Sequence, residues 1–250
     1  MCIRDRFTAV KMEADLPYAE MEPLVRLLAE ESRQAADGAP LSTRELLMAS
    51  QSLRLLAHYD PEMSKEARIY AERLRDLAPG KFDGYFEIAE ADLFEGDMEG
   101  ALENLRLAEE RAYIPRAEFR NLIEVHIAAA HAGSGNFHAM FNSLKKLSDV
   151  KYPLASEPLP VILMAETLTE GADVPQGLIG YAKDIAESNP KSLRTGLAAA
   201  KINAMAGRTD EAMTILDGLA KERPDGAATI EVVRDDIKSI MNDNVEEEKE

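Results

Sequence analysis

Turn-forming residues recur along this chain at a nearly constant interval. They lie near Pro61, Gly96, Gly135, Gly171 and Gly207. The intervals between them are 35, 39, 36 and 36 residues. A fixed period of this length is typical of repeat proteins, in which each unit is one small motif stacked on its neighbours. The spacing predicts about five such units between residues 42 and 224.

The clearest unit runs from Phe82 to Pro115. Each of its halves carries apolar residues three or four positions apart, and Gly96-Asp97 interrupts the pattern between them. This spacing puts the apolar residues of each half on one helix face. The apolar positions are Tyr85, Ile88, Ala89 and Leu93 in the first half, and Ala101, Leu105 and Ala108 in the second. The unit is therefore predicted to be two amphipathic helices joined by a tight turn.

This unit resembles a tetratricopeptide repeat in its order of bulky and small positions, its Gly-Asp turn and its closing proline. It departs from the family pattern at Asp92, where an aromatic residue is usual, and at Pro115, which comes two places late. A second copy ends at Pro224, with Gly207 at its turn. The resemblance implies an all-α fold, an α-solenoid of antiparallel helix pairs, and says nothing by itself about activity.

The remaining parts of the chain fit the ends of such a solenoid. Residues 7–41 are predicted to be the helical segment of a truncated repeat, and residues 42–224 to be about five helix hairpins. Residues 225–241 are predicted to form a capping helix, because an uncovered last repeat would leave apolar surface in water. The acidic residues 242–250 are predicted to be disordered.

The first six residues, MCIRDR, contain the only cysteine of the chain. One choice of codons for this hexapeptide resembles the adapter that transposase-based sequencing kits attach to DNA. We therefore expect residues 1–6 to be an artefact and the chain to be a C-terminal fragment of a longer protein.

The net charge of −17 argues against two classes of partner. So acidic a surface repels phosphate backbones and anionic lipid heads, so neither nucleic acid nor membrane contact by this fragment is predicted. No run of about 18 apolar residues is present to span a bilayer.

No catalytic, cofactor-binding or metal-binding residues are predicted. The four histidines, His58, His126, His131 and His138, lack the spacing that helix-borne metal ligands need, and they are expected at the surface or at helix ends. Carboxylate pairs such as Glu87 with Glu90 are expected on solvated helix faces. A separate enzyme site between residues 151 and 180, where SEPLP interrupts the repeat, is a weaker alternative.

The resemblance implies that the first helices of the repeats line a concave face that binds a peptide or a partner helix. The candidate groove residues are Phe86, Glu90, Phe94, Val125, Ala129, Leu197 and Lys201. The basic clamp that some family members use for a peptide carboxylate is missing, because Phe86 and Glu90 stand at its positions. The expected ligand is an apolar or basic protein segment. Whether Phe86 and Phe94 lie in the groove or pack between repeats stays open.

The sequence thus predicts a non-enzymatic scaffold or protein–protein interaction module. The alternative is the soluble C-terminal repeat domain of a bacterial membrane glycan-assembly protein resembling the O-antigen ligase and polymerase family. The two hypotheses imply different compartments, the cytoplasm or the outer side of a membrane. The sequence decides neither the compartment nor the oligomeric state.

Overall fold

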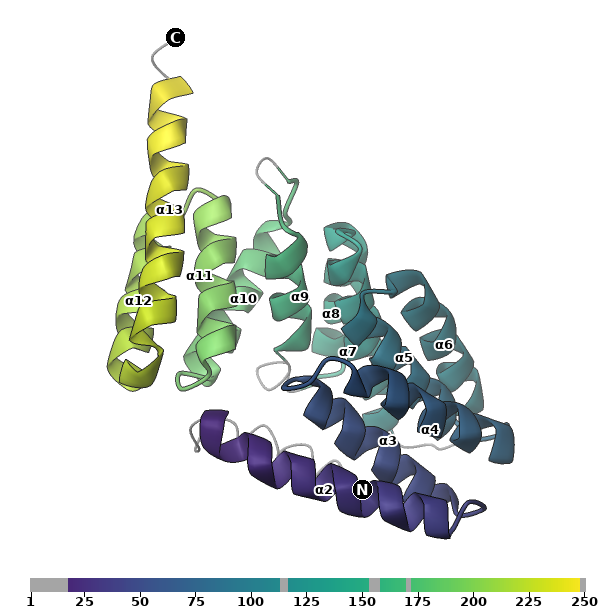
Figure 1. Ribbon diagram of the computed structural model, residues 1–250. Helices are drawn as coiled ribbons and strands as arrows, with labels where there is room; N and C mark the ends of the chain where they lie inside the picture. The colour runs from purple at the N-terminus through teal and green to yellow at the C-terminus, as the bar shows by residue number, and fades with distance from the viewer. Residues whose placement is uncertain (1–17, 113–116, 153–157, 170–171, 248–250) are drawn as a thin grey trace. The chain divides into compact units, whose positions relative to one another are not determined.

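A computed structural model describes residues 18–112, 117–152, 158–169 and 172–247 (Figure 1). These residues are mostly helical and contain no strand, which confirms the all-α prediction for the part of the chain described. The chain divides into two compact units, Met1–Ile127 and Ala128–Glu250. The hexapeptide at residues 1–6 lies outside the described residues.

The first unit is a series of helices in which neighbours in sequence pack against each other. It contains α2 (Tyr18–Gly38), α3 (Thr43–Ala57), α4 (Met63–Leu77), α5 (Asp83–Glu95), α6 (Met98–Arg111) and the first part of α7 (Ala117–Gly133). From α2 to α6, each helix contacts the next, and α3 also contacts α5. The connections between these neighbouring helices are short.

The second unit is helical as well in the part that the structure describes. It contains α8 (Phe137–Asp149), α9 (Leu159–Thr167), α10 (Gln176–Ser188), α11 (Leu193–Met205), α12 (Thr209–Glu222), a 3₁₀ turn at Pro224–Gly226 and α13 (Ala227–Glu247). Helix α11 is central, because it contacts α9, α10, α12 and α13.

Three predicted turns have the backbone conformation that requires glycine. Gly96, Gly135 and Gly207 have φ angles of +82°, +71° and +74°, in the left-handed region that other residues rarely adopt. Asp97 and Asn136 follow two of these glycines, and their side chains accept hydrogen bonds from backbone N–H groups that the next helix leaves unpaired. Each turn therefore ends one helix and caps the next. Gly171 lies outside the described residues.

Each unit has its own apolar core built from the predicted helix faces. In the first unit, one cluster of buried residues comes from α2, α3 and α4: Val25, Ala29, Ala36, Leu46, Ala49, Leu53, Leu56, Ala67, Tyr70 and Leu74. In the second unit, α11, α12 and α13 contribute Ala200, Ala204, Ala212, Leu216, Leu219, Ile230 and Ile237. Burial of each large aliphatic side chain contributes about 1.5–3 kcal/mol.

The C-terminal helix is longer than the sequence predicts. Helix α13 ends at Glu247, so residues 242–247 are helical rather than disordered. Glutamate is a good helix former, and a helix that already packs through Ile230 and Ile237 needs no new nucleus to extend.

Candidate functional site

The structure places four of the seven predicted groove residues in the interior. Phe86 is 2% exposed, and Glu90, Val125 and Ala129 are buried as well. They are therefore not surface contacts for a partner, and the prediction that they line an open groove is wrong. The reason for Phe86 is local, because its ring packs edge-on against Phe82 and against His126 of α7.

The other three predicted groove residues are partly exposed. Phe94 lies 5.4 Å from the His58 ring in an edge-on arrangement, measured between ring centroids. Leu197 and Lys201 lie on α11, in the second unit. Only these three residues of the predicted set remain available at the surface.

Glu90 is buried because two cationic or hydrogen-bonding side chains reach it from neighbouring helices. Arg54 Nη1 of α3 lies 2.7 Å from Glu90 Oε2, and His126 Nε2 of α7 lies 2.5 Å from Glu90 Oε1. The other ring nitrogen of His126, Nδ1, lies 2.8 Å from the Leu122 carbonyl oxygen. Both ring nitrogens of His126 therefore have a polar partner in the interior.

Glu87 belongs to the same cluster. Gln51 Nε2 donates to Glu87 Oε1 at 2.7 Å, and Arg54 Nε lies 3.6 Å from Glu87 Oε2. Burial alone lowers the pKa of the Arg54 guanidinium, but the charges of Glu90 and Glu87 outweigh it and raise this pKa. The expectation that Glu87 and Glu90 lie on a solvated face is therefore wrong, as is the expectation that His126 lies at the surface.

This buried cluster joins three helices of the first unit. Arg54 and Gln51 come from α3, Glu87 and Glu90 from α5, and His126 from α7. Removing one partner from such a cluster leaves an uncompensated charge in the interior, which is strongly destabilising. We assign the cluster a structural role, since the carboxylates are engaged with other side chains and lie away from solvent.

Asp92, the departure from the repeat pattern, is part of a second polar cluster. Arg68 Nη2 lies 2.5 Å from Asp92 Oδ1 and 2.8 Å from Glu95 Oε2, and Asn104 Nδ2 donates to Asp92 Oδ2 at 2.9 Å. Burial raises the pKa of Asp92, although Arg68 and Asn104 act in the opposite direction. Through Asp92, an ion pair thus joins α4 to α5.

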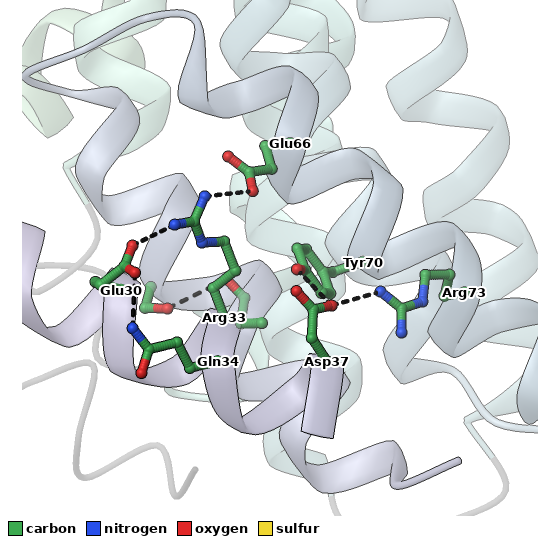
Figure 2. Close-up of polar contacts among 9 residues, drawn as sticks. Glu30, Arg33, Gln34, Asp37, Glu66, Tyr70 and Arg73 are labelled. Carbon is green, nitrogen blue, oxygen red and sulfur yellow. Dashed lines mark hydrogen bonds and ion pairs between the residues drawn. The ribbon is translucent and has the colours of Figure 1, made fainter. Parts of the chain in front are cut away.

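Polar side chains along one side of α2 contact residues of α4 (Figure 2). Asp37 Oδ1 accepts hydrogen bonds from Tyr70 Oη at 3.0 Å and from Arg73 Nη1 at 3.3 Å. Arg33 lies between Glu30 of its own helix and Glu66 of α4, and its Nη1 is 3.5 Å from Glu66 Oε1. These contacts fix the rotation of α2 about its axis and so decide which of its other faces meets solvent.

The solvent-exposed side of α2 carries three leucines as well as charged residues such as Arg26 and Glu31. Leu24, Leu27 and Leu28 are 52%, 57% and 41% exposed. Their spacing of three and four residues places them together on the helix surface, and we call them the α2 stripe. Sequence reasoning missed this stripe, although a signal was present: the run of apolar residues in α2 is too wide for a single buried face.

A pocket of about 200 Å³ lies beside the α2 stripe, between α2 and α3. We call it the α2–α3 pocket. Its lining includes the apolar residues Leu28, Ala35 and Met48 and the acidic residues Glu31 and Glu45. Its remaining lining residues are Ser32 and Arg44. The surface thus joins an apolar stripe to a pocket of mixed apolar and charged lining.

Two further observations bear on function. Among the described residues, no three His, Cys, Asp or Glu side chains are grouped so as to hold a metal ion. Within the same part of the chain, no helix is long and apolar enough to cross a membrane.

No protein-family model matches the chain, and no curated protein matches it.

Proposed function

We propose that this chain is a non-enzymatic protein-interaction module built from tetratricopeptide-like helix hairpins. The observation that carries the proposal is the α2 stripe: three leucines, each more than two-fifths exposed, lie together on a helix of a highly charged chain. Contiguous apolar surface of this kind is typical of sites where a protein binds another.

The packing of the helices supports the assignment to a repeat module. In the first unit each helix from α2 to α6 contacts the next, and left-handed glycines end α5, α7 and α11 just before the next helix begins. Repeat modules of this type present side chains from successive helices on one extended surface, which suits the binding of another protein segment. On this view the polar clusters around Glu90 and Asp92 hold the hairpins together, and binding occurs elsewhere.

The proposal is tested by selecting ligands from a displayed peptide library on the immobilised full chain. We expect enriched peptides to bind the unchanged chain and to lose at least tenfold in affinity with a Leu27→Glu variant. Leu27 is more than half exposed, so this substitution leaves the core intact. The matched control is Val232→Glu on α13, whose side chain is 62% exposed. Library peptides that bind both variants equally well would contradict the proposal.

A further inference from the structure

We infer that the α2 stripe and the α2–α3 pocket together receive a helix from a partner protein, and that this helix carries basic residues beside its apolar face. The inference rests on the proposed function and adds the form and the charge of the ligand. It is carried by the packing of the helices within each unit and by the charges around the pocket.

The first argument is the way this chain packs its own helices. Helix α3 lies against both α4 and α5, and α11 lies against both α12 and α13. In both units, one helix therefore packs against the two helices that follow it in the sequence. Helices α2 and α3 form another consecutive pair, and the outward side of this pair carries the α2 stripe and the α2–α3 pocket. A helix fits this side as α3 fits α4 and α5.

The second argument is the spacing of the side chains that meet the ligand. On α2, Leu24, Leu28, Glu31 and Ala35 follow one another at intervals of four, three and four residues, which places them along one face. On α3, Arg44, Glu45 and Met48 stand across the pocket from this face. Two parallel rows of this kind accept the ridge of side chains on another helix.

The third argument is charge. Both arginines of α2 are engaged with carboxylates, Arg26 with Glu22 and Arg33 with Glu30. Two carboxylates, Glu31 and Glu45, line the pocket against one cation, Arg44, so its lining carries a surplus of negative charge. A hydrogen bond from the Ser42 hydroxyl lowers the pKa of Glu45, which therefore keeps its negative charge at neutral pH. A basic residue on the ligand complements these two carboxylates.

Charge also separates a partner protein from two other occupants. A second copy of this chain carries the same net charge of −17, so two copies repel each other. The residues that precede α2 offer no basic surplus, because the stretch from residue 7 to 17 contains one cation, Lys11, and two carboxylates, Glu13 and Asp15. In that stretch Val10, Met12, Ala14 and Leu16 alternate with charged residues, a pattern that gives no single apolar helix face.

The test uses two synthetic peptides and the full chain. Each peptide has about 16 residues with leucines at helical spacing, and the two differ only in having lysines or glutamates beside the leucines. Binding is measured by fluorescence anisotropy at low salt. We expect the lysine peptide to bind at least tenfold more tightly than the glutamate peptide, and added salt to reduce this ratio.

Two variants locate the binding. Leu28→Asp should weaken the lysine peptide at least tenfold, since Leu28 belongs to both the stripe and the pocket. Glu31→Lys should shift the preference toward the glutamate peptide. Val232→Asp serves as the matched apolar-to-acidic control on α13 and should change neither affinity. Circular dichroism confirms that each variant keeps its helices.

Several outcomes would overturn the inference while leaving the proposed function standing. Equal binding of both peptides refutes the charge argument. Failure of both peptides, while library ligands still depend on Leu27, refutes the helical form of the ligand. Self-association of the full chain that Leu28→Asp abolishes identifies a second copy as the occupant. A tenfold gain in peptide affinity on deleting residues 1–17 identifies the preceding segment as the occupant. Library ligands that ignore Leu27 refute the proposed function itself.

Discussion

Replacing Arg54 by methionine should destabilise the first unit more than the same replacement of any other partly exposed arginine in that unit. Methionine fills similar space but leaves Glu87 and Glu90 in the interior without the guanidinium that now lies 3.6 and 2.7 Å from them. Breaking a buried ion pair by removing one partner costs about 3–5 kcal/mol. Because the Arg54 side chain is 19% exposed, water reaches part of the site, and we expect a loss near the lower value, about 3 kcal/mol.

The assay is urea unfolding followed by circular dichroism at neutral pH. The matched control is Arg73→Met, which removes an ion pair to Asp37 whose two side chains are 35% and 59% exposed. Exposed pairs of this kind contribute less than about 1 kcal/mol, so the control should change the unfolding midpoint little.

A triple variant separates the loss of charge from the loss of packing. If the cost of Arg54→Met comes from unpaired carboxylates, adding Glu87→Gln and Glu90→Gln should restore about half of the lost free energy or more. Equal effects of Arg54→Met and Arg73→Met, or a triple variant less stable than Arg54→Met alone, would refute the reasoning.

Three further predictions concern single positions. A Cβ on Gly84 would lie 2.6 Å from backbone atoms of α4, so Gly84→Ala should lower the free energy of unfolding by about 1–3 kcal/mol. Gly180 has open space around it, so Gly180→Ala should raise the free energy of unfolding by about 0.5–1 kcal/mol. Equal urea midpoints of the two variants would contradict this. Burial and the hydrogen bond to Asp37 raise the pKa of Tyr70 to about 12, so its contribution to stability is complete below pH 10 and is lost as the pH rises toward 12. Tyr70→Phe should therefore lower the free energy of unfolding by about 0.5–1.5 kcal/mol at neutral pH, and this loss should become smaller above pH 10. Urea unfolding at neutral pH and above pH 10 checks this, and an equal loss under both conditions would argue against it. Burial raises the pKa of Asp92, so the stability of the wild-type chain relative to Asp92→Asn should fall as the pH rises from about 3 to 7. The measurement is the difference between the urea midpoints of the two proteins. If this difference rises with pH instead, the linkage has the opposite sign.

The hairpins could be predicted from the sequence because their signals are local. Gly96, Gly135 and Gly207 adopt left-handed conformations that few other residues tolerate, and they occur between helices with period-3.6 apolar faces. The conformation of such a turn depends on two or three adjacent residues. The length of α13 was underestimated because acidic density was taken as a sign of disorder, while glutamate also favours a helix once it has begun.

Burial of charged residues could not be predicted, because it depends on partners distant in sequence. Glu90 was assigned to a surface groove from its place in the repeat, but Arg54 lies 36 residues before it and His126 lies 36 residues after it. A single sequence does not show which of its 46 acidic residues meets which basic group. The same holds for Asp92 and Arg68. The surface now proposed for binding was missed because residues 7–41 were predicted only as the helical segment of a truncated repeat, with no account of which helix face meets solvent.

The most direct test of the central claim is hydrogen–deuterium exchange on the full chain, with and without a ligand selected from the peptide library. The account predicts slower exchange in α2 and in the first turns of α3, where the α2 stripe and the α2–α3 pocket lie, with little change in α11 to α13. Protection confined to α11, or to the exposed side of α5 around Phe94, would show that the ligand binds the first-helix groove predicted from the repeat family and would contradict the account.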